Sequence, residues 1–290
     1  MELERRLSVI PSAELVVLVL DGSGSMKSSD FHDPEVGRVT RGQGVANMFN
    51  YILERLARSS VGDRFFISTA IFATKATVWE AFGHSDRPYY PWALVRKELR
   101  AHTREAGITD VKSWLASKNL LIKATYELAT SLGLGGSTNI ADGFRKAKIV
   151  CDKFFSDNWD ILPPANKRRA TVIMLTDGMA NEEVDKTLDM ADELKKMSVR
   201  IVTVGISEET ARLDECKKLL YDCATPADLE LLSQEVGEGT LVKELLYRPS
   251  GSPEHRLTMI LERIDRSEDI EALRRFLWTV SGGRAERRLR

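Results

Sequence analysis

An aspartate and two serines alternate with glycines in the segment Asp21-Gly-Ser-Gly-Ser25, which directly follows the unbroken apolar run of residues 15–20. In an open parallel sheet, functional groups gather outside the carboxyl ends of the strands. Because Gly22 and Gly24 allow the backbone to turn tightly, the carboxylate and both hydroxyls can converge on one point. Oxygen ligands alone suit a hard cation such as Mg²⁺ or Mn²⁺, rather than zinc or copper.

Two other segments are expected at the same edge of the sheet. Gly135-Gly-Ser-Thr-Asn139 is a glycine-rich turn that places hydroxyls just before a predicted helix, and Thr176-Asp177-Gly178 ends a second buried strand with another carboxylate. Taken singly, the first motif could be a flexible turn, and the last is common after strands. Three such loops in this order are far more specific, and together they predict a cation site.

The elements that must position these loops alternate along the chain. Apolar, β-rich runs at 15–20, 64–72, 76–82, 169–176 and 199–206 are separated by stretches with helical spacing of apolar residues, such as 45–56 and 184–194. The unbroken apolar runs are typical of strands buried on both faces of a mostly parallel sheet. We therefore predict a three-layer, doubly wound α/β fold, in which 64–72 and 76–82 form a hairpin at the edge of the sheet.

Two stretches stand outside the alternation. Residues 83–131 are too long for a simple loop and carry helical patterns of their own, and residues 246–290 contain two short amphipathic patterns and an arginine-rich end. The predicted organisation is an N-terminal segment (1–14), one α/β domain (15–245) with a helical insertion at about 83–131, and a C-terminal helical extension with a basic tail (246–290). The extension either docks on its own domain or serves as a partner-binding element.

Composition excludes several classes of protein. The chain has 290 residues, 43% of them hydrophobic, and its 42 Lys and Arg balance 43 Asp and Glu. This balance gives no reason to expect nucleic-acid binding, and no apolar run approaches the roughly 20 residues of a membrane span. The N-terminal residues do not resemble a secretory signal, and Cys151, Cys216 and Cys223 form no CxxC pair. We therefore expect free thiols and a cytoplasmic location.

The motifs together resemble the von Willebrand factor A-type (VWA) domain, in the form found in intracellular bacterial proteins. DxSxS, the threonine of GGSTN and the aspartate of TDG are the complete pattern of that family's metal-ion-dependent adhesion site, and the resemblance extends over about residues 15–245. It implies a doubly wound, mostly parallel sheet with one antiparallel edge strand. Ser137 stands beside Thr138; we prefer Thr138 because it precedes Asn139 as in the family's turn. The implied metal-site residues are Asp21, Ser23, Ser25, Thr138 and Asp177.

By the same resemblance, Ser23, Ser25 and Thr138 would bind Mg²⁺ directly, while Asp21 and Asp177 would act largely through water. Neutral ligands leave the cation electrophilic, and in this family an Asp or Glu carboxylate of a partner protein completes its coordination. The implied function is a non-enzymatic interaction module, serving an intracellular machine linked to AAA+ ATPases or to a stress-response or defence system. The sequence makes no prediction about oligomeric state.

A rival function is a Mg²⁺-dependent phosphohydrolase that uses Asp21 as the nucleophile. An aspartate after the first buried strand and a later strand-end aspartate would suit an aspartyl-phosphate mechanism. Against it, residue 23 is a serine rather than a second carboxylate, and no strand-end lysine accompanies the pair.

Two further expectations concern the surroundings of the site. Aromatic residues at the start of the insertion, Tyr89, Tyr90 and Trp92, could form a partner-contact rim near the metal, or pack into a small core of the insertion itself. The polar stretch 27–44 carries Asp30, Asp33 and Glu35, which could occlude or regulate the site, or be ordinary solvated charges.

Overall fold

The structure is a computed structural model of the whole chain. It describes residues 12–33, 37–58, 65–79, 87–95, 97–98, 121–178, 180–205, 219–220 and 222–224, together with the single positions 101, 113 and 116. The predicted segments 1–14 (apart from residues 12–14) and 246–290, about half of the predicted insertion, and residues 206–245 of the predicted domain (apart from residues 219–220 and 222–224) lie outside these residues.

A mostly parallel sheet forms the centre of the fold. Strands β1 (Ala13–Asp21), β4 (Phe65–Phe72), β7 (Arg168–Thr176) and β8 (Arg200–Gly205) are parallel, in the order β4-β1-β7-β8. The short strand β5 (Ala76–Val78) pairs with β4 in the antiparallel direction and forms that edge of the sheet. The predicted doubly wound fold with one antiparallel edge strand is confirmed.

A second short antiparallel strand was not predicted. Strand β6 (Tyr90–Pro91) pairs with the first residues of β4, through Phe66 and Ile67. It therefore lies at the opposite end of β4 from Phe72, which pairs with Asp21 at the carboxyl end of β1.

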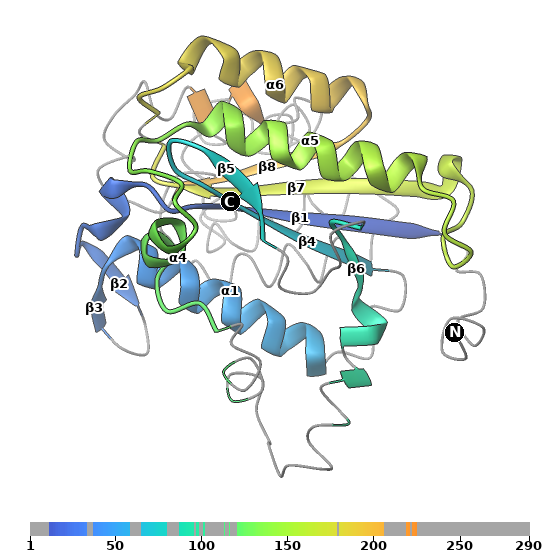
Figure 1. The fold of residues 1–290 in the computed structure, drawn as a ribbon, viewed down its shortest axis with the longest axis horizontal. Helices are drawn as coiled ribbons and strands as arrows, with labels where there is room; N and C mark the ends of the chain where they lie inside the picture. Colours follow the sequence, from blue (N-terminus) through green and yellow to red (C-terminus); the bar gives the residue numbers. More distant parts are fainter. Residues whose placement is uncertain are drawn as a thin grey trace, which may run out of the picture.

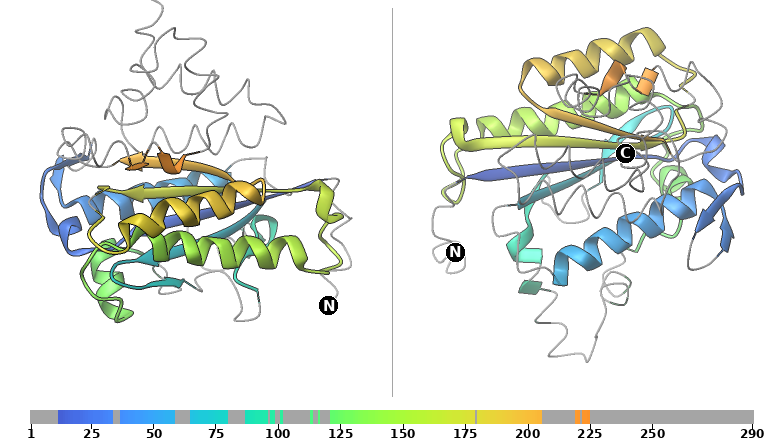
Figure 2. Two further views of the ribbon diagram at one scale, coloured as in Figure 1. Left: turned by 90° about the horizontal axis from the view of Figure 1, so that it is seen from above. Right: turned by 180° about the vertical axis from the view of Figure 1, so that it is seen from behind.

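Helices cover both faces of the sheet (Figure 1). Helices α5 (Ile140–Ser156) and α6 (Val184–Lys196) pack together on one face, and α1 (Arg41–Arg58) and α4 (Thr125–Ser131) lie on the other. The same three layers are visible from behind (Figure 2, right), and the view from above looks down on α5 and α6 lying over the strands (Figure 2, left). Within the described residues, no helix has the length and apolar character that crossing a bilayer requires.

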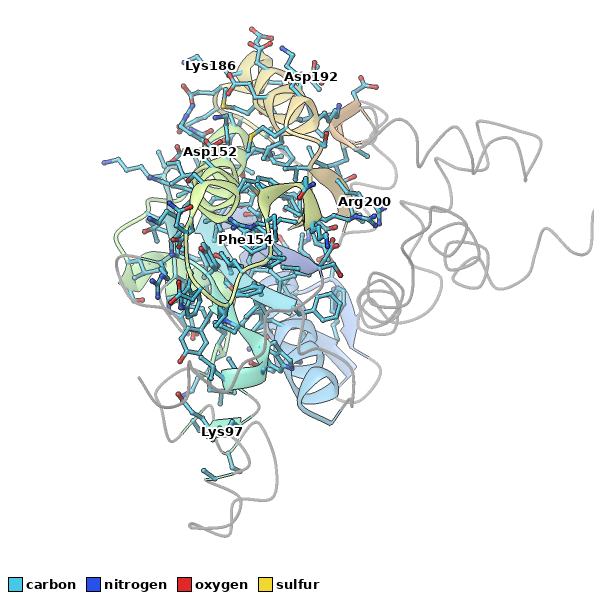
Figure 3. All side chains as sticks on the ribbon, turned by 90° about the vertical axis from the view of Figure 1, so that its right-hand side faces the viewer. Lys97, Asp152, Phe154, Lys186, Asp192 and Arg200 are labelled. Carbon is cyan, nitrogen blue, oxygen red and sulfur yellow. The ribbon has the colours of Figure 1, made fainter. Side chains whose placement is uncertain are left out.

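Apolar side chains are buried on both faces of the sheet, and a large cluster of them lies between the sheet and the α5–α6 layer. Strand β1 is almost entirely buried, as its apolar sequence predicts, and α5 turns one apolar stripe toward it. Phe154 of α5 lies inside the molecule, whereas Lys186 and Asp192 of α6 point outward (Figure 3). This rigid sheet fixes where the loops after β1 and β7 emerge.

The loop after β1 contains more structure than the sequence predicted. A short 3₁₀ helix, η2 (Gly24–Lys27), is followed by a hairpin of β2 (Phe31–Asp33) and β3 (Gly37–Val39). The Phe31 ring lies against Gly44 in the first turn of α1, where a Cβ would approach it to 2.4 Å. The hairpin is therefore held beside the carboxyl edge of the sheet, on the left in Figure 1.

Candidate metal centre

Asp21 is the last residue of β1 and is fully buried. One carboxylate oxygen, Oδ1, accepts a hydrogen bond from the Ser23 backbone N–H at 2.8 Å, and the other, Oδ2, accepts one from the Thr176 hydroxyl at 2.6 Å. The first bond turns the chain back after the strand, as aspartate commonly does in tight turns. The second joins the ends of β1 and β7.

The two serine hydroxyls meet as the alternating motif predicts. Ser23 Oγ and Ser25 Oγ are 3.0 Å apart, with Ser23 buried and Ser25 half-buried. Gly22 makes this turn possible because α4 crosses directly over it: a Cβ at Gly22 would lie 2.5 Å from the Cβ of Ala129. Only glycine fits at such a close approach.

The glycine-rich loop before α5 is joined to the first loop by a backbone bond. The Gly24 N–H donates to the Gly136 carbonyl at 2.8 Å. The N–H groups of Gly136 and Ser137 both donate to the hydroxyl of Thr74, at 3.1 and 3.0 Å. Thr74 belongs to the turn between β4 and β5, so the edge hairpin of the sheet holds this loop in place.

Thr138 lies deeper in the structure than its neighbour Ser137. Thr138 is 2% exposed, whereas Ser137 is half-buried. The Thr138 N–H donates to the Asn181 side chain at 2.7 Å, and the Thr138 carbonyl accepts from the Asn181 N–H at 3.1 Å. Asn181 follows the TDG segment, so these two bonds connect the second loop to the third.

Asp177 directly follows β7 and is fully buried. Its Oδ2 accepts a hydrogen bond from Arg41 Nη1 at 2.9 Å, which also makes an ion pair. Thr176, one residue earlier, accepts from the Gly178 N–H at 3.0 Å while donating to Asp21. The predicted site residues thus lie on three loops that hydrogen bonds join to one another at one edge of the sheet.

Two buried carboxylates, Asp21 and Asp177, lie at this edge of the sheet. Burial, followed by the charge of Asp177, raises the pKa of Asp21 to about 7, against the opposing effect of its hydrogen bonds from Thr176 and Ser23. Burial disfavours the ionised form of a carboxyl group, and a nearby cation favours that form. A cation bound here would therefore favour ionised Asp21.

The donor set fits a hard divalent cation. It consists of hydroxyl and carboxylate oxygens, the ligands that Mg²⁺ and Mn²⁺ prefer. Among the described residues, no three His, Cys, Asp or Glu side chains gather as a metal site. The oxygen ligands that this edge offers include the close pair of serine hydroxyls and the buried carboxylate beside them.

The aromatic residues expected at the rim lie elsewhere, and this corrects the prediction. Tyr89 and Trp92 are each 1% exposed, so neither side chain can form a contact surface. Tyr89 packs edge-on against Phe66 and Phe154 in the core of the domain and donates to Asp157 at 2.5 Å. Together with Tyr90 they lie on or beside β6, at the opposite end of β4 from the metal site. Their large apolar area favours burial over exposure.

Four residues of the site were missed by sequence reasoning. Thr176 precedes Asp177 in the TDG motif, and this position was the one sequence signal that could have indicated its place in the site. Thr74 and Asn181 are ordinary turn residues whose partners are remote in sequence, and Arg41 is one of many charged residues near the start of a helix. All four act through contacts that only the folded chain creates.

Comparison with known proteins yields only structural likenesses. No protein-family model and no curated protein matches the chain. Similar solved structures include the PilB minor pilin of Streptococcus sanguinis, with 14% identity, a TM-score of 0.47, and coverage of 93% of this chain and 63% of that one. BatB from Bacteroides thetaiotaomicron has 14% identity and a TM-score of 0.37, with coverage of 79% and 99%.

A third similar structure has its metal site filled. It is the mussel-byssus proximal thread matrix protein 1 with a zinc-occupied MIDAS motif, with 18% identity, a TM-score of 0.39, and coverage of 75% of this chain and 40% of that one. At these values we base no conclusion about this chain on the three likenesses, and the interpretation of the site depends on its own geometry.

Proposed function

We propose that this protein is a metal-dependent protein-binding module. Its site holds Mg²⁺, with Mn²⁺ as an alternative, and captures an Asp or Glu carboxylate of a partner protein. The observation that carries the proposal is the meeting of Ser23 Oγ and Ser25 Oγ, 3.0 Å apart, beside the buried Asp21 at an edge that also receives Thr138 and Asp177. The motif resemblance to the VWA domain supports the same function.

The residues that would hold the ion divide into two kinds. Ser23, Ser25 and Thr138 would bind it directly, and Asp21 and Asp177 would act largely through water, as the resemblance implies. When bound, the cation supplies a Lewis-acidic position with affinity for a carboxylate.

Hydrogen bonds within the chain hold the Asp21 carboxylate in a fixed orientation. Thr176 and the Ser23 N–H occupy both oxygens of Asp21, which fixes the orientation of its carboxylate. The same bonds count against the phosphohydrolase alternative, because a nucleophilic aspartate needs an oxygen exposed to the substrate, and Asp21 is fully buried. We therefore propose binding without catalysis.

The cellular setting is part of the proposal. We infer a cytoplasmic protein that serves a multiprotein machine, of the AAA+-linked, stress-response or defence kind that the resemblance implies. Cys151 and Cys223 are buried free thiols, which fits a reducing compartment.

The test is affinity capture of the tagged full chain from its native lysate in Mg²⁺ and in EDTA. A Ser23→Ala/Ser25→Ala variant removes two ligands, and a Ser131→Ala/Ser156→Ala variant is the matched control, because both of these serines are exposed and bond only to carbonyls of their own helices. We expect a partner that is retained by wild type and by the control in Mg²⁺, and lost in EDTA and with the site variant. A partner retained in every arm would contradict metal-bridged binding.

A further inference from the structure

A buried arginine lies beside the proposed metal site. Arg41 is 1% exposed and stands between two carboxylates. Its Nη1 donates to Asp177 Oδ2 at 2.9 Å, while Nε and Nη2 donate to the two oxygens of Asp30 at 2.8 and 2.6 Å. A buried charge needs such partners, because an unpaired charge in the interior strongly destabilises the folded state.

The backbone holds Arg41 close to the metal-binding loop. Arg41 is the first residue of α1, and its N–H donates to the Ser28 carbonyl at 2.9 Å. The Ser28 N–H in turn donates to the Ser25 carbonyl at 3.0 Å. The guanidinium group is therefore attached to the same loop that supplies the serine hydroxyls.

Arg41 and a divalent ion at the site would both interact with the negative charge of the Asp177 carboxylate. Each is a cation that the Asp177 charge attracts, and two cations so close together repel one another. Asp30 opposes this repulsion because it accepts two hydrogen bonds from Arg41 and offsets part of its charge. The guanidinium group lowers the pKa of Asp30, so this carboxylate stays ionised at neutral pH.

We propose that Arg41 is a built-in competitor of the metal ion for Asp177, and that Asp30 sets the strength of this competition. This inference rests on the metal site of the proposed function. Without an ion, the guanidinium group neutralises part of the charge of the buried carboxylates and stabilises the empty site. The consequence is a metal affinity held below what the ligands alone would give, so that binding is readily reversible.

The proposal predicts opposite effects for two substitutions at one ion pair. Arg41→Gln removes the competing charge and should tighten Mg²⁺ binding by about tenfold, because one unit of repulsion at short range is lost. Asp30→Asn removes one of the two carboxylates that offset the guanidinium charge and should weaken binding by roughly three- to tenfold. Loss of a merely structural contact would weaken binding in both variants.

The experiment is Mg²⁺ titration by calorimetry on the full chain, with thermal unfolding in EDTA and in saturating Mg²⁺. Arg41→Lys keeps the charge and should bind like wild type. Arg145→Gln is the matched control: it removes an arginine that pairs with Asp142 and Glu183, and should change the affinity less than about twofold. Arg41→Gln should also lower the unfolding temperature in EDTA. Saturating Mg²⁺ should raise the unfolding temperature of this variant more than that of wild type.

The outcomes separate this inference from the proposed function. If Arg41→Gln folds and binds Mg²⁺ more weakly than wild type, Arg41 only positions Asp177 and the competitor role is overturned. If Arg41→Gln does not fold, Asp30→Asn decides, since unchanged or tighter binding there overturns the inference as well. Wild-type protein that binds no Mg²⁺ would instead overturn the proposed function itself.

Discussion

At the scale of single residues, the site combines two carboxylates with different surroundings. Asp21 is held by neutral hydrogen-bond donors, the Ser23 N–H and the Thr176 hydroxyl, whereas Asp177 is paired with the guanidinium group of Arg41. Burial and the neighbouring Asp177 raise the pKa of Asp21 to about 7. A cation bound beside Asp21 would favour its ionised form.

The raised pKa predicts a pH dependence of stability in EDTA. The unfolded Asp21 has a pKa of about 3.9, so between pH 4 and 7 the folded protein holds this proton more tightly than the unfolded chain does. The free energy of unfolding therefore decreases as the pH rises toward 7, by at most about 1.4 kcal/mol per pH unit. Asp21→Asn does not titrate, so its stability relative to wild type should rise from pH 5 to pH 7.

Urea unfolding of both proteins at several pH values measures this difference. Saturating Mg²⁺ is the control condition, and it should reduce the slope because the cation favours the ionised carboxylate. A stability difference that stays constant from pH 5 to pH 7 in EDTA would show that Asp21 titrates normally.

At the scale of elements, the site depends on how closely the helices approach the ends of the strands. Helix α4 crosses over Gly22 so tightly that a Cβ there would lie 2.8 Å from the Thr125 carbonyl and 2.5 Å from the Ala129 side chain. A Cβ placed on Gly136, by contrast, would have no atom within 4 Å beyond its two chain neighbours. The two glycines stand in adjoining loops but differ in what surrounds them.

A pair of alanine substitutions tests this contact. Gly22→Ala should destabilise the protein by about 1–3 kcal/mol, because α4 must move away from β1 to admit the methyl group. Gly136→Ala should change the free energy of unfolding by less than about 0.5 kcal/mol. Urea unfolding gives both values. Equal stability of the two variants would mean that α4 does not lie against the loop as described.

At the scale of the whole molecule, Cys151 and Cys223 both belong to the hydrophobic core that the sheet forms with α5 and α6. Both thiols are buried, and burial raises the pKa of each to about 12. Such thiols react only when the fold opens, because the reactive form is the exposed thiolate. Their labelling rate therefore reports opening of the domain.

Binding of Mg²⁺ at the proposed metal site should slow the labelling of Cys151 and Cys223. In a Cys216→Ser background, we expect no rapid reaction with a disulfide reagent in the native state, and reaction of both thiols after unfolding in guanidinium chloride. An ion that binds only the folded protein adds about 2.7 kcal/mol at 100 times its Kd, which lowers the labelling rate about 100-fold. A rate that Mg²⁺ leaves unchanged in wild type, or one that Mg²⁺ lowers in the Ser23→Ala/Ser25→Ala variant, would contradict the coupling of metal binding to stability.

The sheet and the edge at which the three motifs gather could be predicted from the sequence. Apolar, β-rich runs such as those of β1 and β7 favour buried strands, and the DGSGS, GGSTN and TDG motifs follow elements whose ends topology brings together. These signals are local in sequence, so patterns of residue type and spacing are enough to find them.

The residues that support the site could not be predicted from the sequence and are known from the folded chain alone. Arg41 and Asp177 are 136 positions apart, and Asp21 and Thr176 are 155 apart, so no spacing rule connects them. The same reason explains the misplaced aromatic rim: Tyr89 is buried because β6 pairs with the start of β4, a long-range contact that the composition of residues 83–131 does not reveal. Burial and pairing between remote segments depend on the packing of the whole chain, which local patterns do not specify.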